Sequence, residues 1–393
     1  MELFETSIGH TVNWPFFTLF MVFVGVNILY GMLCCSIKFM RKWPFKIVGW
    51  ALALGMLYIH ILLSYKAHGN IQDFDSYLKI YQNYNSYKDE MYGRFQEWFK
   101  ARGVEFDLYR QIYYAITFVI LWVAVTIIRA NKNIVFGCFA LFPWMFFGRQ
   151  MRIAMAMSLI CLAAALLTMK SWRKIIGIVC FFPLIYLAYS FHGATIFFAV
   201  LIIMGFSFKN RNYIGYIAFV AGTIFIVAYF FGFNLFVKII ESFPKELTDR
   251  LKEYATIVPD HVQTKELLGI ETAYLAAMVF ARLAVTKKQA DKDPTTAKEY
   301  HKVTSLFDSG IAMFCIVLSV TVSLFCIRFI RYFTIIIYAA IAVSMKNAKF
   351  KAFNPFVIAS IAFLLLGTYL NFSFLDSYET GGFDLAFYTF FVF

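Results

Sequence analysis

Residues 148–194 decide the fold of this chain, and they read GRQMRIAMAMSLICLAAALLTMKSWRKIIGIVCFFPLIYLAYSFHGA. The stretch contains two apolar runs, 153–169 and 175–190, joined by a connection that holds Lys170, Arg173 and Lys174. Extended by a few flanking residues, such runs are long enough to cross a bilayer as helices. The stretch therefore predicts two consecutive membrane helices with a basic turn between them.

The rest of the chain has the same character. It is 61% hydrophobic and 20% aromatic with 15% charged residues, and its mean hydropathy of +0.69 is far above that of a soluble protein. We expect an all-α polytopic membrane protein with about twelve transmembrane helices. The candidate spans are 14–37, 47–64, 111–128, 133–147, 153–169, 175–190, 194–207, 213–233, 267–284, 306–327, 332–345 and 355–371.

The net charge of +13 follows position along the membrane normal, which argues against a nucleic-acid partner. Lysines and arginines gather in alternate connections, such as 38–46 and 287–302, and this side is expected to be cytoplasmic. The opposite side holds most acids and five polar residues that flank apolar runs: Arg149, Arg152, His192, Arg328 and Arg331. The seven cysteines show neither CxxC nor histidine spacing, so neither a disulfide framework nor a zinc site is expected. No P-loop, GxGxxG or HExxH motif occurs in usable context, and no cofactor is expected.

The arginines form two pairs with the same spacing, Arg149 with Arg152 and Arg328 with Arg331. Residues three apart share one helix face, so each pair presents two guanidiniums together, a geometry suited to a phosphate or pyrophosphate. Outward acids such as Asp75 could instead neutralise these charges in a purely structural role. Spacing alone leaves both interpretations open.

Residues 1–393 show no repeat and no long internal linker, so one membrane domain with two outward excursions is expected. The first excursion, 65–110, places Tyr77, Tyr81 and Tyr84 at helical spacing. Composition favours an interfacial aromatic belt there, and a platform for sugar rings is the alternative. The second, 234–266, is amphipathic and reads as either a strut on the bundle or a lid.

Residues 148–194 resemble the central part of the EpsG/Wzy family of bacterial polysaccharide polymerases. The residues that match the family layout are Arg149, Arg152, Ile153, Ala154 and His192. Looser matches are Asp75, Tyr77 and Tyr81 in the first excursion and the late motif 328–332, RFIRY. The resemblance is specific across about 45 residues and extends as a pattern over most of the chain.

The resemblance implies a GT-C-like helical bundle in the bacterial plasma membrane with an extracytoplasmic active site. The reaction would join undecaprenyl-pyrophosphate-linked oligosaccharide repeat units without a metal ion, because guanidiniums can stabilise the leaving pyrophosphate. Membrane lipid and a chain-length regulator are the other expected partners. In this hypothesis the four paired arginines bind pyrophosphate, His192 is the catalytic base with Asp75 in reserve, and Tyr77 and Tyr81 bind sugar.

Two other functions fit the same residues. A flippase for a lipid-linked saccharide would use the arginines as transient headgroup contacts, although such transporters usually have internally related halves, and none are evident here. A ligase of the O-antigen type would share the donor chemistry and transfer the glycan to a different acceptor. Only product analysis separates these enzymes.

Overall fold

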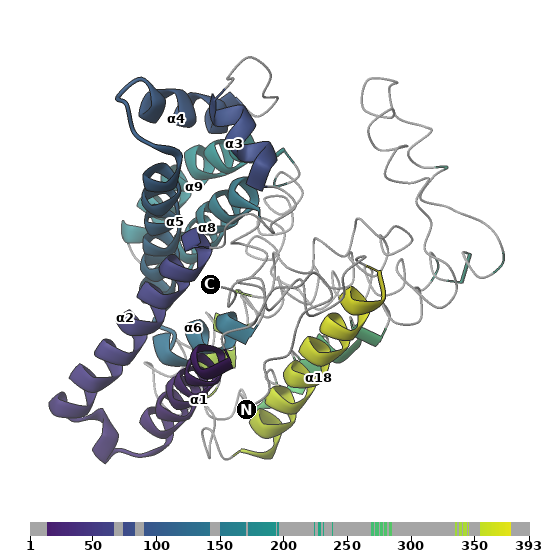
Figure 1. Cartoon of the computed structure of the whole chain (residues 1–393). Helices are drawn as coiled ribbons and strands as arrows, with labels where there is room; N and C mark the ends of the chain where they lie inside the picture. Colours follow the sequence, from purple (N-terminus) through teal and green to yellow (C-terminus); the bar gives the residue numbers. More distant parts are fainter. Residues whose placement is uncertain are drawn as a thin grey trace. The chain divides into compact units, whose positions relative to one another are not determined.

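The computed structural model describes residues 14–66, 74–82, 90–141, 150–169, 172–193, 195 and 354–378, with single residues and short runs between 224 and 345. Figure 1 shows these residues as helices, and no strand occurs among them. The helices are α1 (Trp14–Ser36), the 3-10 helix η1 (Phe39–Arg41), α2 (Trp43–Lys66), α3 (Phe74–Gln82), α4 (Glu90–Lys100), α5 (Phe106–Ile128), α6 (Lys132–Leu141), α8 (Met151–Leu167), α9 (Trp172–Phe191) and α18 (Pro355–Tyr378). The predicted all-α class is confirmed, while the count of twelve spans and the GT-C-like arrangement stay predictions.

Three of the described helices are long and apolar enough to cross a membrane: Pro15–Ser36, Trp43–Ser64 and Phe106–Ile128. Shorter apolar helices cover Lys132–Leu141, Met151–Leu167, Ile175–Phe191 and Pro355–Leu370. Large apolar side chains remain exposed on these helices, with Leu19 71% and Ile175 66% accessible, as expected for surfaces that face lipid. The chain is therefore a membrane protein.

The chain folds as two compact units. The first comprises residues 1–200, 350–352 and 375–393, and the second comprises 201–349 and 353–374. In the second unit, α18 packs on the segment around 270–284: Ser360 donates a hydrogen bond of 2.5 Å to the Ala277 carbonyl, and the Phe280 and Phe363 rings stack at 5.4 Å. The single membrane domain and its excursions at 65–110 and 234–266 stay predictions.

In the first unit, α1, α2 and α6 pack closely around buried asparagines. Asn133 at the start of α6 donates to the Asn27 side chain of α1 at 3.1 Å and to the Gly49 carbonyl of α2 at 2.9 Å. Glycine allows this approach, because a Cβ atom at Gly137 would meet Ile28 at 2.7 Å. Three helices thereby share one polar contact inside an apolar environment.

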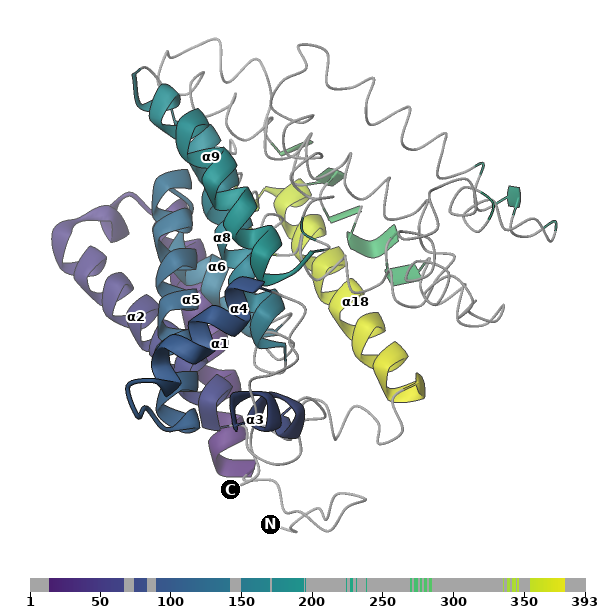
Figure 2. The same ribbon diagram turned by 90° about the horizontal axis from the view of Figure 1, so that it is seen from above.

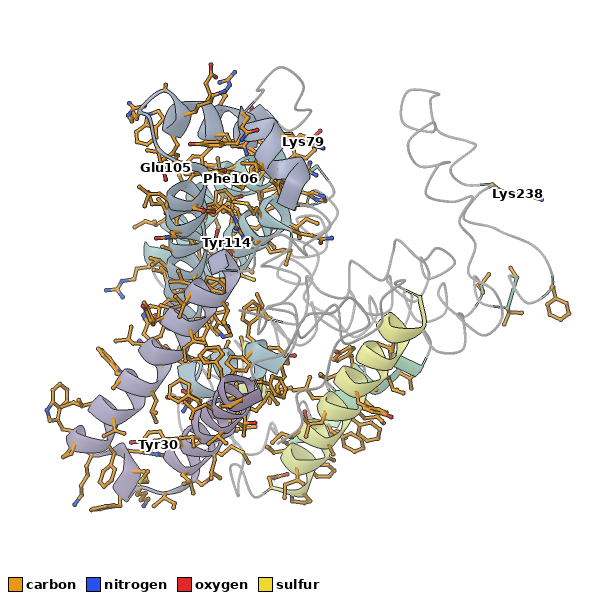
Figure 3. All side chains as sticks on the ribbon, in the orientation of Figure 1. Tyr30, Lys79, Glu105, Phe106, Tyr114 and Lys238 are labelled. Carbon is orange, nitrogen blue, oxygen red and sulfur yellow. The ribbon has the colours of Figure 1, made fainter. Side chains whose placement is uncertain are left out.

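The first unit has two chemically different ends. Tyr30 lies at one end of the helices and Lys79 and Glu105 at the other (Figure 3). The Tyr30 hydroxyl donates a hydrogen bond to the Phe45 carbonyl, within the basic segment 38–46 that includes the start of α2. The opposite end carries the short helices α3 and α4, which lie within the predicted first excursion, and it holds charges of both signs, including Lys79, Arg102, Glu105 and Asp107.

Within the predicted stretch 148–194, residues 151–167 and 172–191 form two packed antiparallel helices, α8 and α9 (Figure 2). The buried residues of α8 include several alanines and Ser158, whose small side chains allow close helix packing. Thr168 follows the last residue of α8, and its hydroxyl donates to the Ala165 carbonyl at 2.6 Å. In α9, Gly177 faces the main-chain carbonyl of Leu166. Small residues therefore let the two helices approach closely, and α5 covers α8 on another side.

Candidate active site

Arg152 lies in the first turn of α8, which begins at Met151. Its side chain is half-buried, and its Nε atom is shielded from solvent. The first N–H groups of any α-helix lack carbonyl partners within the helix, so this end carries a partial positive charge to which Arg152 adds a full one. The turn can therefore attract an anion.

Tyrosines from α4 and α5 hold this turn of α8. The Tyr113 hydroxyl donates a hydrogen bond to the Met151 carbonyl at 3.0 Å, and the Tyr92 hydroxyl lies 3.8 Å from the Met151 sulfur. Tyr113 also interacts electrostatically with Arg152. Both tyrosines are fully buried, so the turn that carries Arg152 is fixed by groups inside the protein core.

His192 follows α9 directly and lies at the same end of the helical pair as Arg152. Its N–H donates to the Ala188 carbonyl at 2.9 Å, which continues the helical pattern, and its carbonyl accepts the Thr195 hydroxyl at 2.7 Å. The preceding Phe191 ring packs 6.3 Å from the Tyr113 ring. His192 is half-buried, with Nδ1 shielded from solvent.

Helix α3 carries three of the predicted site residues. Tyr77 and Tyr81 are 5% and 6% exposed, and their rings pack on Tyr92 at 5.9 Å and on Tyr109 at 5.1 Å. The Tyr81 hydroxyl donates to the Val104 carbonyl at 2.7 Å, and burial raises the pKa of this phenol. Asp75 lies in the first turn of α3. Sugar binding by the two tyrosines stays a prediction.

Arg110 is a residue that the sequence analysis treated only as the end of a loop. It lies in the second turn of α5 and is 2% exposed, donates to the Ser64 carbonyl of α2 at 3.1 Å, and lies 3.9 Å from the Asp107 carboxylate. The Tyr114 hydroxyl also interacts with the guanidinium. The sequence signal that could have found Arg110 is its position just before an apolar run. An arginine buried in a membrane helix has either a structural or a functional role.

The structure brings together several of the predicted residues from distant parts of the sequence. The Tyr92 and Tyr113 rings, whose centroids are 5.9 Å apart, contact Tyr77 of α3 and the residues before Arg152 and His192. Tyr81 joins this cluster through the Tyr109 ring, which packs on Tyr113. Arg149, Arg328, Arg331 and the excursion 234–266 fall outside the described residues. Their predicted roles therefore stay predictions.

Within the described ranges, no group of three or more His, Cys, Asp and Glu side chains comes together. The five cysteines described there, Cys34, Cys35, Cys138, Cys161 and Cys180, are free thiols. Around the start of α8 and the end of α9, the described polar groups include the Arg152 guanidinium, the His192 imidazole and the Tyr92 and Tyr113 phenols. Such groups can bind an anion, accept or donate a proton, and contact sugar rings.

The helices and these polar groups define a membrane protein with a candidate anion-binding end. The model of the EpsG family matches residues 50–389, and the chain belongs to this family. Membership points to a glycosyltransferase-like polysaccharide polymerase, which agrees with the predicted family. No curated protein and no solved structure matches the chain.

Proposed function

We propose that this protein polymerises undecaprenyl-pyrophosphate-linked oligosaccharide repeat units on the outer face of the bacterial plasma membrane. Family membership supports the reaction class. The observation that carries the proposal is the placement of Arg152 and His192 at one end of the α8–α9 pair, where the residues that precede them, Met151 and Phe191, both contact Tyr113. Transfer from a pyrophosphate donor needs a cationic group for the leaving group and a proton acceptor for the attacking hydroxyl.

The proposed reaction is a substitution at the anomeric carbon of the donor. The acceptor hydroxyl oxygen forms the new glycosidic bond, and its proton passes to His192, with Asp75 as the alternative base. The bond from the anomeric carbon to the pyrophosphate oxygen breaks, and its electron pair leaves with the lipid pyrophosphate. Arg152 and the positive end of α8 stabilise that developing charge, together with Arg149, Arg328 and Arg331 in the full proposal.

The charge distribution of the first unit supports an outward-facing site. The end that holds Arg152 and His192 is also the end of α3 and α4, where acids such as Glu105 and Asp107 accompany the basic residues, whereas the segment 38–46 at the Tyr30 end has basic residues and no acid (Figure 3). Basic connections are retained on the cytoplasmic side. The proposed site would then face the periplasm or cell exterior.

The test is elongation by purified protein in nanodiscs that contain undecaprenyl-pyrophosphate-linked repeat units. A polymerase yields a ladder of longer lipid-linked products. A ligase yields transfer only when a different acceptor is added, and a flippase yields neither. We expect the ladder to persist with excess EDTA, because guanidiniums supply the electrostatic stabilisation. Absence of any ladder from active, folded protein would overturn the proposal.

A further inference from the structure

The first turn of α8 is held at two points by α4 and α5. Tyr113 bonds the main chain of this turn at the Met151 carbonyl, and Tyr92 contacts the Met151 side chain. The two tyrosine rings meet edge to face at 5.9 Å with an interplanar angle of 86°. A turn fixed through both its main chain and its side chain has little freedom to shift or rotate.

Further hydrogen bonds involve the Tyr92 hydroxyl and the Tyr113 main chain. Gln96 of α4 donates to the Tyr92 hydroxyl at 3.1 Å, and Thr117 of α5 donates to the Tyr113 carbonyl at 2.8 Å. The four side chains are at most 1% exposed. Burying a hydroxyl group costs free energy unless the group is hydrogen-bonded. Phenylalanine would fill the same space in this core without that cost. The hydroxyl groups therefore have a specific task at this turn.

The same two tyrosines reach the other elements that carry the proposed chemistry. Tyr92 packs on Tyr77 of α3, the helix that bears Asp75. Tyr113 packs on Phe191, the residue before His192. Arg152, His192 and α3 thus share one pair of rings as their common support.

We propose that Tyr113, assisted by Tyr92, is a positioning residue that sets Arg152 relative to His192. The inference rests on the proposed function. Catalytic groups must be held within about 0.5 Å of their productive geometry, which long side chains achieve only when their supporting turn is fixed. In this arrangement the hydroxyl of Tyr113 acts on the leaving pyrophosphate through the turn that carries Arg152.

The first test compares Tyr113→Phe with Tyr109→Phe in the elongation assay. Tyr109 is the control: it lies one turn earlier on α5 and is equally buried, and its hydroxyl interacts with Tyr92 but makes no hydrogen bond to a described atom of α8. Tyr113→Phe loses one hydrogen bond, which corresponds to about a three- to tenfold decrease in rate. We expect this decrease mainly in kcat, because Arg152 stabilises charge that develops in the transition state. The Tyr109 variant should retain wild-type kcat and KM.

A double-mutant cycle separates positioning from a general structural role. If Tyr113 acts through Arg152, then Tyr113→Phe should lower kcat much less in an Arg152→Lys background than in the wild type. A purely structural residue would lower the yield of folded protein and leave kcat per folded molecule unchanged. Multiplicative defects, or a Tyr113→Phe enzyme with the kcat of Tyr109→Phe, would overturn the inference.

Further measurements separate failure of the proposed polymerase function from failure of the positioning role of Tyr113. If Tyr113→Phe does not fold, Tyr92→Phe takes its place. It removes the hydroxyl contact to the Met151 sulfur and the acceptor for Gln96 but leaves the Tyr113 bond to the Met151 carbonyl, so it should give a smaller loss of kcat in the same cycle. A wild-type protein that makes no ladder refutes the proposed function itself. A wild-type protein that elongates, beside tyrosine variants that do so equally well, refutes only the positioning role.

Discussion

Gly177 on α9 lies against the main-chain carbonyl of Leu166 on α8, so closely that a Cβ atom at position 177 would collide with that oxygen. A main-chain carbonyl near the end of a helix cannot move aside as a flexible side chain can. The contact fixes the separation of α8 and α9 near their connecting turn. It therefore also constrains the far end of the pair, where Arg152 and His192 lie.

Substitution Gly177→Ala should force the two helices apart. Overpacking of this kind costs about 1–3 kcal/mol, so we expect a lower unfolding temperature in detergent and reduced elongation. Gly25→Ala is the matched control, because a Cβ atom there meets nothing within 4 Å and alanine favours the helix. Equal unfolding temperatures for the two variants would contradict the close packing of α8 on α9.

A second prediction concerns the asparagine pair of α1 and α6. Asn133→Leu removes the donor to Asn27 and to the Gly49 carbonyl and leaves two buried acceptors. Interhelical hydrogen bonds in membranes contribute about 0.6 kcal/mol on average and up to about 1.7. We expect a destabilisation of that size in denaturant titrations, with part of it recovered when Asn27→Leu is added. Full additivity of the two changes would show that the pair does not act as a unit.

Much of the helical content could be predicted from hydropathy. The run predicted at 14–37 matches α1, 153–169 matches α8, and 175–190 matches α9 within a few residues. Two helices begin earlier than their apolar runs predicted: α2 begins at Trp43 instead of residue 47, and α5 begins at Phe106 instead of residue 111. In both cases a charged residue, Lys46 or Arg110, ended the apolar run and so hid the first turns of the helix. A lysine near a helix end can extend its ammonium group to the interface, and an arginine can be buried when it is hydrogen-bonded.

The network that supports the site could not be predicted. Tyr92, Gln96 and Tyr113 are ordinary interfacial residues in a single sequence, and their bonds to one another and to Met151 arise from packing of three helices far apart along the chain. Helical spacing did predict that Tyr77 and Tyr81 share a face, and both are buried together. What that face contacts depends on tertiary structure, which periodicity does not encode.

Arg152→Ala should abolish elongation in practice. Loss of one preorganised donor to a developing oxyanion lowers kcat about 10²- to 10³-fold, and Arg152→Lys should retain part of the activity, because lysine keeps the charge without the bidentate geometry. Arg173→Ala is the control, since this exposed arginine lies in the first turn of α9, at the opposite end of the helical pair. Product ladders measured at equal amounts of folded protein decide the outcome, and an active Arg152→Ala protein would remove this residue from the mechanism.

The identity of the base gives the last prediction. Removal of a general base typically lowers kcat about 10²- to 10⁴-fold with little change in substrate binding. His192 lies at the end of α9 beside the ring cluster that supports Arg152, so His192→Ala should show this pattern, while Asp75→Asn on α3 should give a smaller defect. The main chain around His192 is held by Ala188 and Thr195 bonds that do not involve the imidazole, which makes an alanine at 192 compatible with the fold. Single-turnover elongation with saturating donor separates kcat from binding, and a dead Asp75→Asn enzyme beside an active His192→Ala enzyme would exchange the two roles.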